Sequence, residues 1–485
     1  MEDIIIIGGG ICGCSLLYEL SRYQLKTLLL EKENDIACGT TKANSAIVHA
    51  GYDPEPGTLM ARVNVEGNKL IERLSNDLDV LYKKTGSLVV GFNDEDRKTI
   101  EKLFENGNKN GVPGLRIIEA NELFDMEAQV SREAVCALYA PNAGIISPWE
   151  LASAQAECAV QGGAKLELDC EVRAIQKEKD GFIVVTNKGN YQARYVVNAA
   201  GVNSDKISEL IETKHFSIQP KSGEYYILDT TERNLVKMII FPCPSKLGKG
   251  VLVAPTVHGN IIVGPDSKNW KRDDYATSRE GLDAVRRNAV RTIPTVNLRA
   301  SIRNFSGIRA DAERNDFIIG ESKEIEGFFN IAGIKSPGLS SAPAIAKEVS
   351  ELLHKKGLEF RPNPAFIAKR SVKRFKYMNE EEKKRTIQEN PLYGTIVCRC
   401  ETVTEGEIVD ALQRPIPPRS LDAVKRRCTP GMGRCQSGFC GPRVLELIQK
   451  YSHVKPEDIP KDRKGMYIIS GETKTKNNTA QGVVK

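Results

Sequence analysis

The feature that most constrains the fold is the opening stretch MEDIIIIGGGICG, in which an apolar run leads into a glycine-rich turn. The run DIIII at residues 3–7 is typical of a buried parallel strand. Gly8, Gly10 and Gly13 then follow the spacing that allows a tight turn, close approach of a pyrophosphate and packing of a helix on the strand. Glu31 ends a second predicted strand, where a carboxylate can accept hydrogen bonds from a ribose. The sequence therefore predicts a dinucleotide-binding βαβ unit.

Three later segments favour FAD over NAD as the dinucleotide. The first, GTTKANSAIVHAG (39–51), follows the second strand. Its hydroxyl groups can reach phosphate and ribityl groups, and they belong to Thr40, Thr41 and Ser45. The second, YVVNAAGVNSDKI (195–207), is a strand that ends at Ala-Ala-Gly, with Asp205 beyond it. The third, GIKSPGLSSAPAIAKEV (333–349), is a glycine-rich strand-to-helix junction whose backbone amides could face a flavin.

Residues 1–360 resemble the D-amino-acid-oxidase-like family of FAD-dependent dehydrogenases. The resemblance is carried by HAGYDPEPGTLMARVNVEGNKL, KSGEYYILD, APTVHGN, SGIRAD and GIKSPGLSSAP, which are similar to motifs of glycerol-3-phosphate and L-2-hydroxyglutarate dehydrogenases. It implies that a substrate C–H hydride passes to flavin N5. It also implies cofactor contacts from Gly8, Gly10, Ile11, Gly13, Glu31, Thr40, Thr41, Asn44, Ser45, Val172, Gly201, Asp205, Gly307, Gly338, Leu339 and Ser340.

The substrate site of such an enzyme needs a base near the reacting hydroxyl and cations for the anionic groups. Arg309 matches the family's arginine for a carboxylate or phosphate; a structural salt bridge is the alternative. Lys335 is expected at the flavin edge or the substrate, or else exposed in a loop. His49 and His258 are the candidate bases, although His258 suits a turn equally well. Further substrate contacts are expected from Lys221, Glu224 and Tyr225.

A second site is indicated by five cysteines between residues 398 and 440. Four of them form a C-x-C pair and a C-x4-C pair, and they are Cys398, Cys400, Cys435 and Cys440. Structural zinc modules usually present C-x2-C pairs, and neither pair has that spacing. Zinc remains the alternative to an iron–sulfur cluster, and Cys428 is expected to be no ligand.

The phrases VCRCETVTEGEI and KRRCTPGMGRCQSGFCGPRV resemble the bacterioferritin-associated-ferredoxin-like [2Fe-2S] domain of anaerobic glycerol-3-phosphate dehydrogenases. That resemblance implies a [2Fe-2S] cluster on the four thiolates. Thr404 and Glu407 form a capping box, and Pro442 suits the first turn of a helix. We therefore expect a helix to begin after each cysteine pair, where its dipole favours thiolates.

The predicted fold class is α/β. A Rossmann-like FAD-binding domain of the glutathione-reductase type is interleaved with an antiparallel β-rich substrate domain, and a small, mainly helical [2Fe-2S] domain follows. The predicted boundaries are 1–85, 149–213 and 320–360 for the FAD-binding domain, 86–148 and 214–319 for the substrate domain, 361–392 for a linker, 393–450 for the [2Fe-2S] domain, and 451–485 for a weakly ordered tail.

The two resemblances together imply a dehydrogenase that converts sn-glycerol 3-phosphate to dihydroxyacetone phosphate. Its electrons would leave one at a time through the cluster, to a quinone or a partner protein. L-2-hydroxyglutarate, or another 2-hydroxy acid, is the alternative substrate. The alternative of another class is an electron-transfer subunit without catalysis of its own.

Composition limits the setting in which the chain works. The longest apolar stretch, residues 4–17, contains four glycines and is too short to span a bilayer. The net charge is +6, and no aromatic-interleaved basic patch indicates nucleic-acid binding. The run KRSVKRFK (369–376) predicts a solvated linker helix, or a surface for anionic lipid or a partner subunit. We expect a cytoplasmic protein, with peripheral membrane association and oligomerisation left open.

Overall fold

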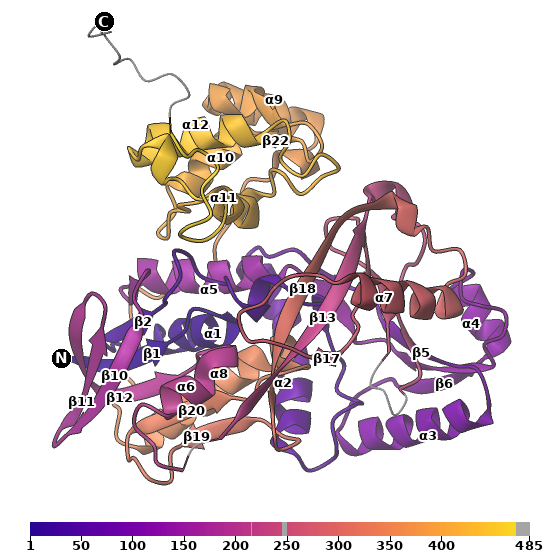
Figure 1. Cartoon of the computed structure of the whole chain (residues 1–485), viewed down its shortest axis with the longest axis horizontal. Coiled ribbons are helices and arrows are strands. Elements are labelled where there is room, and N and C mark those ends of the chain that lie inside the picture. The colour runs from indigo at the N-terminus through magenta and orange to yellow at the C-terminus, as the bar shows by residue number, and fades with distance from the viewer. Residues whose placement is uncertain (215, 245–249, 472–485) are drawn as a thin grey trace, which may run out of the picture. The chain divides into compact units, whose positions relative to one another are not determined.

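The computed structural model describes residues 1–214, 216–244 and 250–471, which form two compact units. The first unit is Met1–Lys373, and the second begins at Arg374. The predicted α/β fold class is confirmed, because the first unit combines two large sheets with helices and the second is small and mainly helical (Figure 1).

One sheet of the first unit carries the nucleotide-binding turn. Its central strand is β1 (Glu2–Ile7), which pairs in parallel with β2 (Thr27–Leu30) and β12 (Gly189–Asn198). Alternate isoleucines of β1 belong to two different hydrophobic clusters, so the strand is buried on both faces. This burial explains why its apolar run is continuous. The other strands are β9 (Lys165–Glu167), β10 (Val172–Glu178), β11 (Gly181–Thr186), β19 (Ile318–Glu321) and β20 (Phe328–Ala332).

Helices cover this sheet and pack closely on one another. The glycine-rich turn leads into α1 (Ile11–Leu20), which contacts α5 (Pro148–Gln161) and α8 (Gly338–Lys355). A second long helix, α2 (Leu59–Asp77), packs on α8. A short helix, α6 (Ser204–Ser208), follows β12.

The second large sheet of the first unit is mostly antiparallel, as predicted for the β-rich segment. Its strands are β5 (Ser87–Gly91), β6 (Arg116–Glu119), β7 (Cys136–Ala140), β13 (Ile218–Leu228), β14 (Ile239–Pro242), β15 (Leu252–Pro255), β16 (Ile261–Gly264), β17 (Lys268–Asn269) and β18 (Ser301–Ala312). The predicted hairpin at His258 and Gly259 joins β15 to β16 and is confirmed. Three helices follow strands of this sheet in the chain, namely α3 (Asp94–Lys109), α4 (Ala120–Met126) and α7 (Arg279–Thr292).

A small three-stranded sheet completes the first unit. It consists of β3 (Ile47–Val48), β4 (Tyr82–Lys84) and β8 (Gly144–Ile146), with β8 in the middle. The strand β3 comes just before His49, so this sheet fixes the backbone that leads to one of the candidate bases.

The segment predicted as a linker, residues 361–392, is divided between the two units. Its first part is tied to the first unit, where Asn363 Nδ2 donates to Ser21 O at 3.0 Å and Arg370 Nη1 lies 2.7 Å from Glu157 Oε2. Its last part holds α9 (Glu380–Glu389). The basic run 369–376 is extended apart from a short 3-10 turn, so the predicted helix there is wrong. Buried partners such as Glu157 hold it in this form.

The second unit packs three short helices around one hydrophobic cluster. They are α10 (Glu405–Leu412), α11 (Leu421–Cys428) and α12 (Gly441–Ser452), and a hairpin of β21 (Ile396–Cys398) and β22 (Val403–Thr404) precedes them. Part of the predicted tail packs on these helices, because Ile459 is buried and Asp462 lies 2.9 Å from Arg426. The predicted tail is therefore packed on the helices as far as Asp462, contrary to the weak order predicted for it, and residues 472–485 lie outside the described part.

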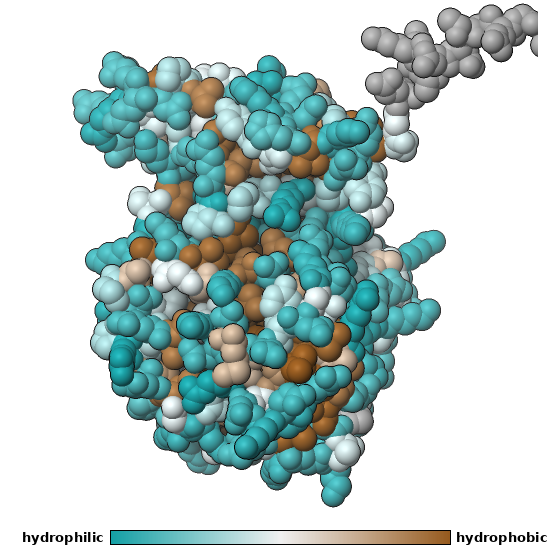
Figure 2. All heavy atoms as spheres, turned by 90° about the vertical axis from the view of Figure 1, so that its left-hand side faces the viewer, coloured by the Kyte–Doolittle hydropathy of each residue, from teal (hydrophilic) through white to brown (hydrophobic). Residues whose placement is uncertain are grey.

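In the described ranges, no helix is both long and apolar enough to cross a bilayer. Figure 2 shows a face on which hydrophilic residues predominate and hydrophobic residues gather in several groups between them.

Candidate functional site

The glycine-rich turn has the geometry of a pyrophosphate cradle. Gly8 has φ +112°, and a Cβ there would lie 2.5 Å from Ala199 O. A Cβ on Gly13 would lie 2.0 Å from Gly8 O, so only glycine lets α1 pack against the end of β1. A Cβ on Gly10 would meet only Thr41 Oγ1, at 3.4 Å, and Gly10, as the N-cap residue, has no side chain to cap the helix. The N-terminus of α1 therefore has room for an anionic group.

Glu31 stands beside this turn at the end of β2. Its carboxylate accepts hydrogen bonds from Gly9 N at 2.6 Å and Glu33 N at 2.9 Å. Burial raises the pKa of Glu31, while these two backbone bonds act in the opposite direction. Thr41 Oγ1 accepts from Ile11 N at 2.9 Å, which ties the segment after β2 to the first turn of α1. Both predicted contacts thus lie at the turn.

The segment 39–45 also touches the substrate sheet. Thr40 Oγ1 donates to Ile308 O in β18 at 2.6 Å, and Asn44 Nδ2 donates to Thr40 O at 3.0 Å. A Cβ on Gly307 would lie 1.9 Å from Ala43 O, so glycine is required for β18 to pass this closely. The predicted cofactor segment and the predicted substrate strand therefore lie together.

The start of α8 provides a second helix N-terminus without a side-chain cap. Gly338 is its first residue, followed by Leu339, which is partly buried. Ser340 is fully buried, and its Oγ accepts a hydrogen bond from His49 N at 2.7 Å. The Ser340 side chain therefore holds the backbone of His49 in place.

Three predicted cofactor residues lie neither at the glycine-rich turn nor at the start of α8. Asp205 is buried and makes two bonds to the Arg272 guanidinium, of 2.6 and 2.8 Å. Burial opposes ionisation of Asp205, but the Arg272 hydrogen bonds prevail and hold its pKa below the usual range. This carboxylate thus joins α6 to the loop after β17. Val172 begins β10 and packs against the hydrophobic cluster that contains Ile5 and Ile7 of β1. Gly201 has φ +58°, and a Cβ there would meet no atom within 4 Å.

The predicted cations gather on one face of the β13–β18 pair. Lys221 lies opposite Arg309 in this pairing. The Arg309 guanidinium lies over Gly223, where a Cβ would come within 2.2 Å of Nη2, and Arg309 Nη2 donates to Asp266 O at 2.9 Å. Lys335 comes from the loop before α8 and reaches the same strand. The structure therefore brings together three cations that are far apart in the sequence.

Asp311, which the sequence reasoning missed, binds two of these cations. Its Oδ2 lies 2.5 Å from Lys221 Nζ, and its Oδ1 lies 2.6 Å from Lys335 Nζ. Burial opposes ionisation, but hydrogen bonds from the two lysines prevail and lower the pKa of Asp311. A signal was available, since Asp311 follows Arg309 by two residues and a strand repeats its faces with that period.

His49 is held at both its backbone and its ring. Its carbonyl oxygen accepts from Asn64 Nδ2 at 3.0 Å and Asn68 Nδ2 at 3.1 Å. Its Nε2 lies 3.2 Å from Ser336 Oγ, and its ring stacks on Phe241 with centroids 5.9 Å apart. Ser336, next to Lys335, is a second residue that sequence reasoning missed. The His49 imidazole is thus fixed close to the loop that carries Lys335.

His258 lies in a different environment. It occupies the turn between β15 and β16, and its ring stacks on Trp149 with centroids 5.9 Å apart. Trp149 belongs to the first turn of α5. The described contacts of His258 thus fit the turn interpretation better than the base interpretation.

Glu224 and Tyr225 are engaged within the protein. Glu224 is fully buried, forms an ion pair with Lys268 and accepts from Ser278 Oγ at 2.8 Å. It points away from Lys221 because residues three apart on a strand lie on opposite faces. Tyr225 stacks on Phe305 with centroids 4.7 Å apart, and its hydroxyl lies 3.2 Å from Ser45 Oγ. The described contacts of both side chains are made within the protein, and their predicted contacts to the substrate stay predictions.

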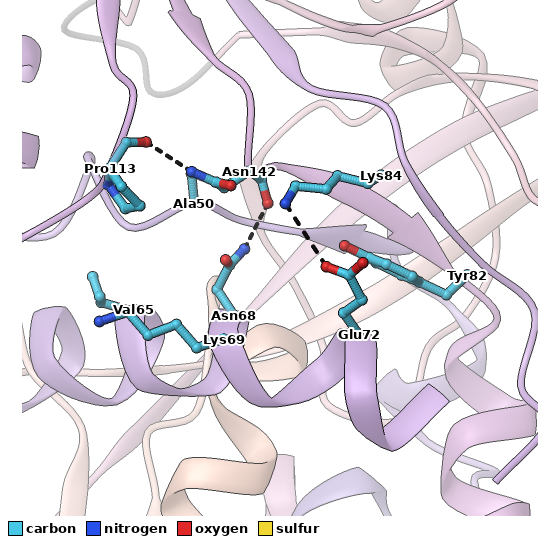
Figure 3. Close-up of a pocket in the computed structure, with 9 residues that line it drawn as sticks. All are labelled: Ala50, Val65, Asn68, Lys69, Glu72, Tyr82, Lys84, Pro113 and Asn142. Carbon is cyan, nitrogen blue, oxygen red and sulfur yellow. Dashed lines mark hydrogen bonds and ion pairs between the residues drawn. The ribbon is translucent and has the colours of Figure 1, made fainter. Parts of the chain in front are cut away.

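A pocket of about 220 Å³ lies beside the backbone of His49 (Figure 3). It is lined by Ala50, Val65, Asn68, Lys69, Glu72, Tyr82, Lys84, Pro113 and Asn142. Asn68 Nδ2 donates to Asn142 O at 2.9 Å, and Lys84 Nζ lies 3.7 Å from Glu72. None of the predicted site residues lines this pocket, so its polar groups are separate from the cation group.

The four predicted cysteines of the second unit lie in two pairs. Cys400 Sγ lies 3.9 Å from Cys435 Sγ, and Cys398 is hydrogen-bonded to Cys440. That bond and the backbone N–H groups of Gly431 and Glu401 lower the pKa of Cys398 to about 6. In the described part of the chain, no three His, Cys, Asp or Glu side chains could hold one metal ion. Two thiol pairs fit a two-iron cluster, in which each iron takes two thiolates.

Close backbone approach shapes the cysteine loops. A Cβ on Gly433 would lie 2.3 Å from Cys400 Cβ, and a Cβ on Gly431 would lie 2.0 Å from Ser437 Oγ. Non-glycine residues with positive φ surround the loops, and they are Thr402, Thr429, Gln436 and Ser437. Successive backbone N–H groups in such conformations form concave sites for anions.

The predicted helix starts after the cysteine pairs are confirmed. Thr404 and Glu407 form a reciprocal capping box at α10, and Cys440 is the N-cap of α12 with Pro442 in its first turn. Cys428 instead ends α11, where its Sγ hydrogen-bonds to Val424 O at 3.5 Å. Its burial raises its pKa, which keeps the thiol protonated.

Known proteins match both units. Residues 3–352 match the family described as FAD dependent oxidoreductase, and residues 396–450 match the BFD-like [2Fe-2S] binding domain. A glycerol 3-phosphate dehydrogenase of Caloramator mitchellensis is 46% identical over 98% of this chain and 99% of its own. The mitochondrial L-2-hydroxyglutarate dehydrogenase of Bos taurus is 32% identical over 58% of this chain and 65% of its own.

A solved structure agrees with these matches. The L-alpha-glycerophosphate oxidase from Mycoplasma pneumoniae with FAD bound covers 77% of this chain and 99% of its own, with a TM-score of 0.72 and 29% identity. The cofactor predictions, FAD and a [2Fe-2S] cluster, are confirmed by the family matches and this FAD-bound relative.

Proposed function

We propose that this chain, which belongs to the FAD-dependent oxidoreductase family and carries a BFD-like [2Fe-2S] binding domain, oxidises sn-glycerol 3-phosphate to dihydroxyacetone phosphate. The electrons leave through the cluster to a quinone or a partner protein. The similarity to a glycerol 3-phosphate dehydrogenase supports this substrate, because it extends over almost the whole chain and includes the cysteine domain.

The grouping of Lys221, Arg309 and Lys335 carries the proposal. A phosphate monoester has a charge of about −1.5 to −2 near neutral pH and three acceptor oxygens. A guanidinium fork with two ammonium groups supplies both the charge and the donors that such an anion needs. Ser336, on the loop that also carries Lys335, lies 3.2 Å from Nε2 of His49, which follows β3. The cations and the base therefore suit opposite ends of one small hydroxy phosphate.

When bound, FAD accepts the hydride of the substrate C–H bond, and the cluster passes single electrons. The protein's part is to bind, orient and deprotonate. Arg309 and the two lysines bind the phosphate, while His49 Nε2 takes the proton of the secondary hydroxyl. Ser336 Oγ, 3.2 Å from that nitrogen, holds the imidazole in the free protein, and the substrate hydroxyl takes its place at Nε2. The hydrogen bond from His49 N to Ser340 fixes the base from its backbone side.

The turn at residues 8–13 and the start of α8 are the parts that hold FAD in this proposal. Glu31 binds the ribose hydroxyls, and the N-terminus of α1 binds the pyrophosphate. The two cysteine pairs hold the cluster, with N–H groups of Gly431 and Glu401 bonded to the sulfur of Cys398.

The substrate is tested by mixing the purified protein, without oxygen, with sn-glycerol 3-phosphate, L-2-hydroxyglutarate or L-lactate in separate experiments. We expect sn-glycerol 3-phosphate to bleach the flavin absorbance fastest. Faster bleaching by L-2-hydroxyglutarate would show that this hydroxy acid, and not sn-glycerol 3-phosphate, is the substrate. No bleaching by any of the three compounds would favour the alternative of an electron-transfer subunit without catalysis of its own.

The anion site is tested by Arg309→Ala. Because this change removes a charge-assisted contact, we expect KM for sn-glycerol 3-phosphate to rise about tenfold or more, with FAD still bound. Arg279→Ala is the matched control, since that arginine side chain is 97% exposed on α7. Unchanged kinetics in Arg309→Ala would remove Arg309 from the site.

A further inference from the structure

We infer that Asp311 is a positioning residue for the proposed oxidation, which fixes the two lysine ammonium groups at the site without itself binding the substrate. This inference rests on the proposed function and deepens it. It adds a residue whose role is to set the geometry of the anion site, in addition to the cations that bind the anion.

The first support is that Asp311 uses both of its oxygens. One carboxylate oxygen lies 2.5 Å from Lys221 Nζ on β13, and the other lies 2.6 Å from Lys335 Nζ on the loop before α8. The carboxylate therefore links the substrate sheet to the loop at the flavin side. Two ammonium groups brought this close would repel each other, and a shared carboxylate offsets that repulsion.

The second support is burial. The Asp311 side chain is 14% exposed, whereas Lys335 is 23% and Lys221 is 35% exposed. The carboxylate thus lies deeper than the ammonium groups it binds. A substrate phosphate arriving from solvent meets the lysines and Arg309 before it meets Asp311.

The third support is the link to the base. Lys335 immediately precedes Ser336, whose Oγ lies 3.2 Å from His49 Nε2. Fixing the Lys335 side chain therefore restrains the loop that orients the imidazole. Lys335 also lies 3.4 Å from Asn315 Oδ1, but Asp311 is its charged partner. Asp311 thereby acts on the anion-binding end and on the base end of the site together.

The inference is tested by Asp311→Asn, which keeps the shape and removes the charge. The freed lysines still attract phosphate, so KM should change less than about threefold. Misplacement of the reacting groups should lower kcat by about tenfold to a hundredfold. Asp283→Asn on α7, which removes an exposed carboxylate paired with Arg279 and Arg286, is the control and should leave both constants unchanged.

A second variant separates positioning from folding. Asp311→Glu keeps the charge on a longer arm and should retain FAD with a smaller loss of kcat. Normal kcat in Asp311→Asn would overturn the inference. So would loss of FAD or of thermal stability in Asp311→Asn together with normal kcat in Asp311→Glu, because the role would then be structural. If L-2-hydroxyglutarate proves to be the substrate, the proposed function fails, but the same split between kcat and KM still decides the role of Asp311.

Discussion

The cation group of the first unit and the cysteine loops of the second unit are assembled in opposite ways. The cation group joins Lys221, Arg309 and Lys335 from two strands and a distant loop. The cysteine loops supply two of the four cysteines from each of two short stretches, with a helix starting right after each stretch. A site built from distant strands depends on register and on which face a residue occupies. A site built from local stretches depends mainly on spacing and helix capping, so it tolerates more substitutions in other parts of the chain.

The largest expected effect separates the two sites completely. Cys398→Ser should abolish the cluster's visible absorbance, because it removes one of the four thiolates that the cluster needs. Flavin absorbance and bleaching by substrate should stay normal. Cys428→Ser is the control and should keep the cluster. Loss of FAD in Cys398→Ser would show that the two sites are not independent.

The converse change affects the flavin site alone. Gly13→Ala would place a Cβ 2.0 Å from Gly8 O, so α1 has to move away from β1. We expect most of the FAD to be lost, while the cluster absorbance remains. Gly163→Ala is a control of the same kind, since a Cβ there meets no atom within 4 Å although its φ of +105° adds local strain. Full FAD content in Gly13→Ala would contradict the proposal that the turn at residues 8–13 binds the FAD pyrophosphate.

A smaller effect tests whether Glu224 contacts the substrate. Glu224→Gln leaves Lys268 without its buried charge partner, so the free energy of unfolding should fall by about 2–4 kcal/mol. KM for the substrate should stay within about twofold, because Glu224 faces away from Lys221. Denaturant unfolding and steady-state kinetics measure the two effects. A large rise in KM with normal stability would restore Glu224 as a substrate contact.

The smallest effect concerns acid stability. The folded pKa of Asp205 is depressed, so its ion pair with Arg272 stabilises the protein above about pH 5 and loses this effect as the pH falls through the usual and then the folded pKa. Asp205→Asn should lower the free energy of unfolding by about 2 kcal/mol at pH 7 and flatten its pH dependence below pH 5. An unchanged acid slope would mean that other carboxylates dominate it.

The cysteine region could be predicted in more detail than the cation group. Spacing gave the four cysteines, and the capping residues Thr404 and Pro442 gave the helix starts. In the first unit, motif positions indicated Arg309 and Lys335, but they gave no sign that Glu224 is buried against Lys268. The ion pair of Asp205 was not predicted, because its partner, Arg272, comes from a loop 67 residues later. Long-range ion pairs of this kind have no local sequence signal.

The most direct test of the central claim is an anaerobic titration of the whole protein with sn-glycerol 3-phosphate, followed at the flavin band and by the electron paramagnetic resonance of the reduced cluster. FAD takes two electrons and the cluster takes one, so complete reduction should require about 1.5 equivalents of a two-electron donor. We expect the flavin band to bleach and the cluster signal to grow towards that end point. Bleaching that ends at about one equivalent without a cluster signal, or no bleaching at all, would contradict the account.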